Sequence, residues 1–120
     1  MLKLCRINIE RSSEIFEKIK DYIKEVVAKL NPHLIILFGS FATNNINEGS
    51  DIDILVVADF KEDFLDRIGK LMNLNKFGIP VEPVGYTPKE FNRMRMERNP
   101  FLLEVLEKGK VMYRRNNFLL

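Results

Sequence analysis

The apolar and polar positions along the chain form two patterns, and each pattern predicts one kind of element. Apolar residues that recur every three to four positions predict amphipathic helices, whereas short runs rich in apolar and β-branched residues predict strands. The predicted helices cover residues 12–30, 40–44, 59–75, 88–98 and 101–108. The predicted strands cover residues 34–38, 51–58, 81–86 and 111–113.

The order of these elements predicts an α/β fold. Strands interleaved with helices indicate a mixed sheet of about four strands that is backed by helices. Turn signals agree with the boundaries, because Asn31-Pro32 follows the first long helix and Gly109 follows the last helix. The chain shows no internal repeat, linker or low-complexity stretch, so residues 1–120 are expected to form a single domain.

Composition and cysteine usage exclude several classes of protein. With 46% apolar and 30% charged residues, the chain has the make-up of a globular domain, and no apolar run approaches the roughly 18 residues of a membrane helix. The charged N-terminus lacks a signal-peptide pattern, so we expect a cytoplasmic protein. One cysteine, Cys5, and one histidine, His33, leave no internal disulfide, zinc cluster or histidine-based triad, and we assign both to structure.

Charge is nearly balanced, at +2 overall, but it is unevenly spread. Residues 89–120 carry eight basic and four acidic side chains, Arg93, Arg95 and Arg98 among them. A solvated helical face is the favoured interpretation, and a patch that contacts phosphates or an acidic partner is the alternative. Because the chain lacks a basic groove and a nucleic-acid module, nucleic acid is not expected as a partner.

Two aspartates stand out in the second predicted strand. Asp51 and Asp53 lie among isoleucine, leucine and valine, although aspartate is rare in strands and a buried carboxylate is costly. Residues two apart on a strand point to the same face, so the two carboxylates repel each other unless a cation lies between them. Mg²⁺ fits, because it accepts one or two protein carboxylates and completes its shell with water and phosphates. The pair therefore indicates nucleotide chemistry.

A second motif follows the first predicted strand. Gly39-Ser40 ends the buried run and opens a predicted helical turn, an arrangement in which backbone N–H groups and a hydroxyl contact a phosphate. Taken separately, a Gly-Ser turn and an Asp-x-Asp strand are more often structural than functional. Ten residues separate Ser40 from Asp51, enough to turn into a neighbouring strand, so both motifs are expected to face one cleft.

The combined pattern, Gly39-Ser40 followed after ten residues by Asp51-x-Asp53, resembles the signature of the DNA polymerase β-like nucleotidyltransferase superfamily. The similarity is to its minimal, stand-alone prokaryotic form, of the antitoxin (MntA-like) type. The resemblance implies a polymerase β palm-like fold, with two Mg²⁺ ions on the Asp pair and on a third carboxylate of the next strand. It also implies that the Gly-Ser turn holds the β- and γ-phosphates. By position, the third carboxylate is Glu82.

The residues around Glu82 support this assignment independently. Glu82 is the only acidic residue from Lys76 to Lys89, and it alternates with apolar neighbours on a short predicted strand. Pro83 lacks a backbone N–H, which predicts that this strand lies at a sheet edge or is distorted there. In the functional interpretation, Glu82 binds the metal that activates an attacking hydroxyl and accepts its proton. The alternative is an edge-strand glutamate in solvent.

One position departs from the family pattern. The family often carries Arg-Gly after its Gly-Ser-x-Ala element, whereas Thr43-Asn44 stand here. The missing cation would weaken nucleotide binding unless an arginine elsewhere replaces it. Arg93, Arg95 and Arg98 are the candidates, although a solvated face is the favoured interpretation of all three.

The resemblance implies an Mg²⁺-dependent nucleotidyltransferase. It would take ATP or another nucleoside triphosphate, transfer the nucleoside monophosphate to a hydroxyl acceptor and release pyrophosphate. No residues are left for an acceptor-binding domain, so the acceptor must dock from outside, in a homo- or hetero-oligomer. Family analogy suggests a HEPN-type toxin of a toxin–antitoxin system as the partner. The alternative is a non-catalytic antitoxin or scaffold that binds nucleotide and neutralises its partner by contact.

Overall fold

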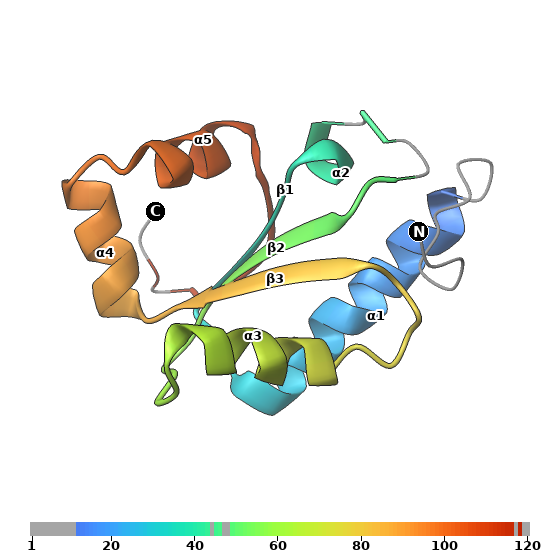
Figure 1. The fold of residues 1–120 in the computed structure, drawn as a ribbon, viewed down its shortest axis with the longest axis horizontal. Helices are drawn as coiled ribbons and strands as arrows, with labels where there is room; N and C mark the ends of the chain where they lie inside the picture. The colour runs from blue at the N-terminus through green and yellow to red at the C-terminus, as the bar shows by residue number, and fades with distance from the viewer. Residues whose placement is uncertain (1–11, 44, 47–48, 117, 119–120) are drawn as a thin grey trace.

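The computed structural model describes residues 12–43, 45–46, 49–116 and 118, and its elements follow the predicted order (Figure 1). The helices are α1 (Ser12–Leu30), α2 (Ser40–Thr43), α3 (Phe64–Asn73), α4 (Pro88–Met96) and α5 (Pro100–Lys108). The strands are β1 (Leu34–Phe38), β2 (Ile52–Val57), β3 (Val81–Tyr86) and β4 (Lys110–Arg114). The α/β fold class is thus confirmed.

Most boundaries agree with the predicted ones to within two residues, and two of the differences bear on the site and the core. β2 begins at Ile52, so Asp51 lies just before the strand instead of inside it. α3 begins at Phe64, because the preceding segment turns at Phe60, whose N–H donates to the Ala58 carbonyl at 2.8 Å. Phe60 itself packs into the core. Phe60 therefore belongs to a turn, and the apolar residues at helical spacing begin at Phe64.

The four strands of the described chain form one mixed sheet in the order β3-β2-β1-β4. β1 is antiparallel to β2 and β4, and β2 is parallel to β3. The predicted mixed sheet is therefore confirmed. β3 lies at an edge, as Pro83 predicts, because an edge strand can tolerate a residue without an N–H.

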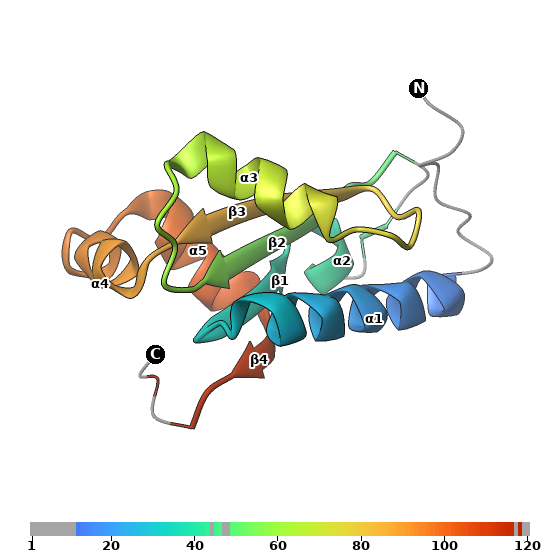
Figure 2. The same cartoon turned by 90° about the horizontal axis from the view of Figure 1, so that it is seen from below.

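Helices cover both faces of the sheet. α1 and α3 pack on one face, where the hydroxyl of the buried Tyr22 donates to the Leu71 carbonyl at 2.7 Å (Figure 2). α4 and α5 pack on the other face through Phe91, Leu102 and Val105 (Figure 1). Within the described residues, no helix is long and apolar enough to cross a membrane.

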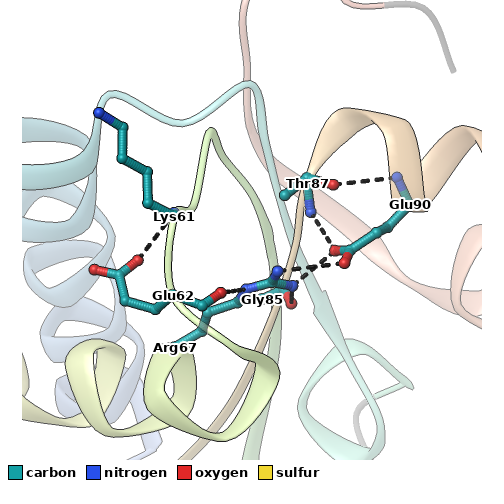
Figure 3. A network of polar contacts seen from close by, with 6 residues as sticks. All are labelled: Lys61, Glu62, Arg67, Gly85, Thr87 and Glu90. Carbon is teal, nitrogen blue, oxygen red and sulfur yellow. Dashed lines mark hydrogen bonds and ion pairs between the residues drawn. The ribbon is translucent and has the colours of Figure 1, made fainter.

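A buried arginine joins α3, β3 and α4 (Figure 3). Arg67 donates through Nε to the Glu62 carbonyl at 2.7 Å and through Nη1 to the Gly85 carbonyl at 3.2 Å. Its two Nη atoms also reach the Glu90 carboxylate at 2.7 and 3.3 Å. Glu90 closes a capping box with Thr87 at the start of α4. We call these contacts the Arg67 network; they fix β3 and α4 relative to α3.

Candidate active site

Three acidic residues gather at one end of the sheet, and we call them the acidic cluster. Asp53 is the second residue of β2, where it lies opposite Phe38 of β1 and Glu82 of β3. Because side chains alternate along a strand, Asp53 shares a face with Leu55, which belongs to the core beneath α4 and α5. Asp51 lies two residues before Asp53 and is exposed.

The Asp53 carboxyl is partly buried among like charges, and its pKa is raised accordingly. Burial is the largest cause, followed by a hydrogen bond with Glu82 and by the charges of Glu82 and Asp51. Together they raise the pKa of Asp53 from 3.8 to about 6. Neighbouring carboxylates disfavour each other's ionisation unless a cation balances them. The structure thus places Asp53 opposite Glu82, with Asp51 near enough for its charge to act on Asp53.

The donor set of the acidic cluster fits a hard divalent cation such as Mg²⁺. Carboxylate oxygens are the ligands that Mg²⁺ prefers, and one or two of them suffice when water and substrate phosphates fill the other positions. In the described part of the chain, no three His, Cys, Asp or Glu side chains are close enough to hold an ion on their own. Asp53 and Glu82, opposite each other on β2 and β3, would supply the one or two protein carboxylates that Mg²⁺ needs.

Gly39 makes the turn that brings the end of β1 against the acidic cluster. Its backbone has a φ of 72°, a left-handed conformation that favours glycine. A Cβ at this position would also collide with the Asp53 carboxylate. α2 begins at the next residue, Ser40. The Gly-Ser turn that the sequence predicts to bind phosphates thus lies directly beside the predicted metal ligands.

Two cavities share the side chain of Asp53. The Gly39 cavity has a volume of about 380 Å³, and the Glu82 cavity has a volume of about 460 Å³. Residues around the Gly39 cavity include Gly39, Thr43, Asp53, Phe101, Glu104 and Lys108. Residues around the Glu82 cavity include Phe38, Asp53, Ile68, Met72, Glu82 and Phe101. One cavity is thus bordered by Gly39 and by charged side chains, and the other is mostly apolar around Glu82.

α5 contributes cavity residues that the sequence did not single out. Phe101, Glu104 and Lys108 line the Gly39 cavity, and the Phe101 ring meets Phe38 edge-on with 5.6 Å between centroids. Their spacing predicts only a helix. One feature of the sequence points to these residues: Gly109 leaves only a short link between α5 and β4. Because β4 pairs with β1, this link places the end of α5 beside the Gly-Ser turn.

The three arginines that were candidates for a replacement cation line neither cavity. Arg93 pairs with Glu97 at 3.3 Å on the surface of α4. The guanidinium of Arg95 lies 6.0 Å from the ring centre of Phe91, and Arg98 is exposed. Arg93 and Arg98 are exposed, which fits the favoured interpretation of a solvated surface, whereas Arg95 is half-buried.

The remaining residues that the sequence draws attention to lie outside these two cavities or outside the described residues. His33 lies at the start of β1, at the opposite end from the Gly-Ser turn. Tyr86 and Tyr113 each pack against one of the two hydrophobic cores. Cys5 and Asn44 lie outside the described residues.

Known proteins match the chain in sequence. The pattern of the family described as "Polymerase beta, Nucleotidyltransferase" matches residues 17–118. "Putative protein adenylyltransferase MJ0604" of Methanocaldococcus jannaschii is 36% identical over 101 residues, which cover 79% of this chain and 94% of the relative. "Putative protein adenylyltransferase MJ1305" of the same organism is 32% identical over 90 residues, which cover 70% of this chain and 60% of the relative.

Solved structures share the fold. The crystal structure of a "putative nucleotidyltransferase" from Sulfolobus solfataricus has a TM-score of 0.64 at 21% identity, and the match covers 100% of this chain and 96% of the other. The crystal structure of a "toxin-antitoxin with AMP-PNP" has a TM-score of 0.51 at 19% identity and covers 81% of this chain and 74% of the other. Fold and sequence together define a nucleotidyltransferase. The chain belongs to the polymerase β nucleotidyltransferase family.

Proposed function

We propose that the chain transfers AMP from ATP to a hydroxyl group of a partner protein. In this reaction the acceptor oxygen forms a bond to the α-phosphorus, the bond from that phosphorus to the bridging oxygen breaks, and pyrophosphate leaves. The observation that carries the proposal is the position of the Asp53 carboxylate, which lies against Gly39 of the Gly-Ser turn and opposite Glu82 of β3. Burial, together with Glu82 and Asp51, raises the pKa of Asp53 to about 6. Both M. jannaschii relatives are named as protein adenylyltransferases, which supports the transferred group and the class of acceptor.

The acidic cluster is the proposed catalytic and metal-binding group. Asp51, Asp53 and Glu82 would hold Mg²⁺, two ions in all, together with the phosphates of the nucleotide. Bound Mg²⁺ supplies positive charge that offsets the charge of the triphosphate and of the departing pyrophosphate. Glu82 accepts the proton of the attacking hydroxyl. Gly39 and Ser40 hold the β- and γ-phosphates through backbone N–H groups and the hydroxyl.

The two cavities fit two different substrates. The Gly39 cavity, beside the phosphate turn, is the proposed site of ATP. The Glu82 cavity contains the proposed proton acceptor and is lined mainly by apolar side chains such as Ile68 and Met72. It therefore suits a hydroxyl that a protein partner presents on an apolar surface. Because Asp53 lines both cavities, the α-phosphate and the acceptor oxygen would meet at the acidic cluster.

The proposed partner is a HEPN-type toxin, with this chain as its antitoxin in a hetero-oligomer. The structural neighbour described as a toxin–antitoxin with AMP-PNP supports a partnership of this kind and a nucleotide on the fold. The second candidate function is a non-catalytic antitoxin that neutralises the toxin by contact. Thr43, a neutral residue where the family often has arginine, favours that candidate.

Label transfer decides between the two candidates. The chain is co-expressed with a HEPN-type protein, and the purified complex is incubated with ATP labelled at the α-phosphate, with Mg²⁺ or with a chelator. The proposal predicts label on the partner only when Mg²⁺ is present, together with release of unlabelled pyrophosphate. A wild-type chain that neutralises the toxin without any label transfer would establish the binding function and contradict the enzymatic one.

A further inference from the structure

We propose that the ammonium group of Lys108 binds the phosphate chain of the nucleoside triphosphate, and that Glu104 is its counter-ion in the free protein. Both side chains line the Gly39 cavity together with Gly39, Thr43 and Asp53. The inference rests on the proposed function, because it assigns a further ligand of the same substrate. It names the source of the positive charge that Thr43 does not provide.

The position of Lys108 is fixed by the way α5 ends. The Gly109 N–H donates to the Val105 carbonyl at 2.7 Å, and β4 starts at the following residue. A Cβ at Gly109 would lie 2.7 Å from Cγ2 of Ile36 and 3.2 Å from the Leu37 carbonyl, so the turn passes directly over β1. Leu37 is two residues before the phosphate turn. The last turn of α5 is therefore held beside Gly39 by backbone packing.

In the free protein, Lys108 forms only a weak ion pair with Glu104. Lys108 Nζ lies 3.4 Å from the Glu104 carboxylate, and the two side chains are 59% and 67% exposed. An exposed ion pair four residues apart on a helix contributes little to stability, so little is lost when it breaks. The ammonium group carries three donors on a flexible stem and suits phosphate oxygens. Nucleotide binding can thus exchange a weak pair for a stronger one.

The other described side chains around the Gly39 cavity supply no positive charge to the phosphate chain. Asp53 is a proposed Mg²⁺ ligand, and Glu104 carries a negative charge that would repel a triphosphate. Thr43 is neutral, and its hydroxyl turns back to the carbonyls of Gly39 and Ser40 at 3.4 and 3.5 Å. Lys108 is the basic side chain among the described residues that line this cavity.

The competing interpretation is structural. A lysine in the last turn of a helix interacts favourably with the helix dipole, and a glutamate four residues earlier adds a surface ion pair. Under that interpretation, removal of the ammonium group changes the stability of α5 slightly and affects all nucleotides equally. Binding to the phosphate chain instead predicts a loss that depends on the number of phosphates.

The test is isothermal titration of Mg-ATP and of AMP into the wild-type chain and its variants. Lys108→Ala should raise the Kd of Mg-ATP about tenfold, which corresponds to one charged hydrogen bond, while the Kd of AMP changes less than about twofold. Lys108→Arg should restore most of the Mg-ATP affinity. Glu104→Gln should tighten Mg-ATP binding, because it removes a repelling charge and frees Lys108.

The matched control is Lys110→Ala, two residues further on in β4, which is exposed and lines neither cavity. It should leave both Kd values unchanged. Equal losses for ATP and AMP in Lys108→Ala, or no loss at all, would overturn the inference and leave the proposed function intact. A wild-type chain that does not bind Mg-ATP would instead overturn the proposed function itself.

Discussion

β3 contributes residues to two groups of charged side chains. In one group a carboxylate is paired with a cation of the same chain, and in the other two carboxylates face each other. At Gly85, the Arg67 network places a guanidinium against the Glu90 carboxylate at 2.7 Å. Hydrogen bonds from Arg67 are the largest cause that lowers the pKa of Glu90. Three residues earlier, Glu82 faces another carboxylate, and the pKa of Asp53 is raised to about 6.

The difference separates a structural from a functional use of charge. A carboxylate whose partner is a cation of the same chain stabilises the fold when it ionises. A carboxylate crowded by others lowers stability when it ionises, and such groups are enriched at sites that bind or react. The acidic cluster therefore fits a role for a cation from outside the chain, whereas the Arg67 network needs none.

The largest expected effect is that of Glu82→Gln on transfer. The substitution keeps the size and hydrogen bonding of the side chain but removes the proposed proton acceptor, so the rate of label transfer should fall about 10²- to 10⁴-fold. Mg-ATP affinity should change only modestly, because Asp51 and Asp53 are retained. Rates and Kd values measured on the same preparation separate these effects.

Glu97→Gln is the matched control for that substitution. Glu97 lies on the exposed surface of α4 with Arg93 as its partner. Its removal should leave the transfer rate unchanged. A Glu82→Gln chain that labels its partner as fast as the Glu97→Gln chain would show that Glu82 is not the third catalytic carboxylate.

The next effect concerns the Arg67 network. Arg67→Ala leaves the carbonyls of Glu62 and Gly85 without their donor and Glu90 without its partner, so the free energy of unfolding should fall by about 2–4 kcal/mol. Urea unfolding followed by circular dichroism measures this. Arg93→Ala, which breaks an exposed pair, should cost less than about 0.5 kcal/mol. Equal costs for the two variants would contradict the structural role of the network.

A smaller effect is the opposite pH dependence of the two groups. The pKa of Asp53 is about 6 in the fold and 3.8 ordinarily, so stability should fall as pH rises through this interval, by about 1–3 kcal/mol in the absence of metal. The pKa of Glu90 is below its ordinary 4.5, so its stabilisation is complete above that pH and is lost as pH falls through the folded pKa.

The Asp53→Asn substitution isolates the contribution of Asp53 to the pH dependence of stability. Unfolding of the wild type and of the variant in urea at a series of pH values, with a chelator present, gives the difference between their free energies. That difference should grow in favour of the variant as pH rises from 3.8 to about 6. A difference that does not vary with pH would mean that neither burial nor the neighbouring carboxylates raise the pKa of Asp53.

The order of the elements could be predicted because apolar spacing directly reflects burial. β1 and β2 are buried on both faces, and their nearly continuous apolar runs show it. Asp51 and Asp53 were recognisable for the same reason, since carboxylates in such a run need a cause. Pro83 indicated the edge position of β3 through its missing N–H.

Contacts between residues far apart in the sequence could not be predicted. Arg67 reads as a solvated residue of an amphipathic helix, but its acceptors Gly85 and Glu90 lie 18 and 23 residues away. Lys108 reads as an ordinary helix end, and only the close approach of Gly109 to β1 brings it to the Gly39 cavity. Neither relation is encoded in local spacing.

Thermal unfolding with Mg²⁺, with ATP and with both together tests most directly whether the acidic cluster binds a metal–nucleotide complex. Mg-ATP at about a hundredfold excess over its Kd should stabilise the wild type by about 2.7 kcal/mol, on the order of 10 °C in Tm for a chain of this size. Either component alone should shift Tm far less. The Asp51→Asn/Asp53→Asn double variant should fold and show no shift with Mg-ATP. A wild-type Tm that Mg-ATP leaves unchanged, or an equal shift in the double variant, would contradict the central claim.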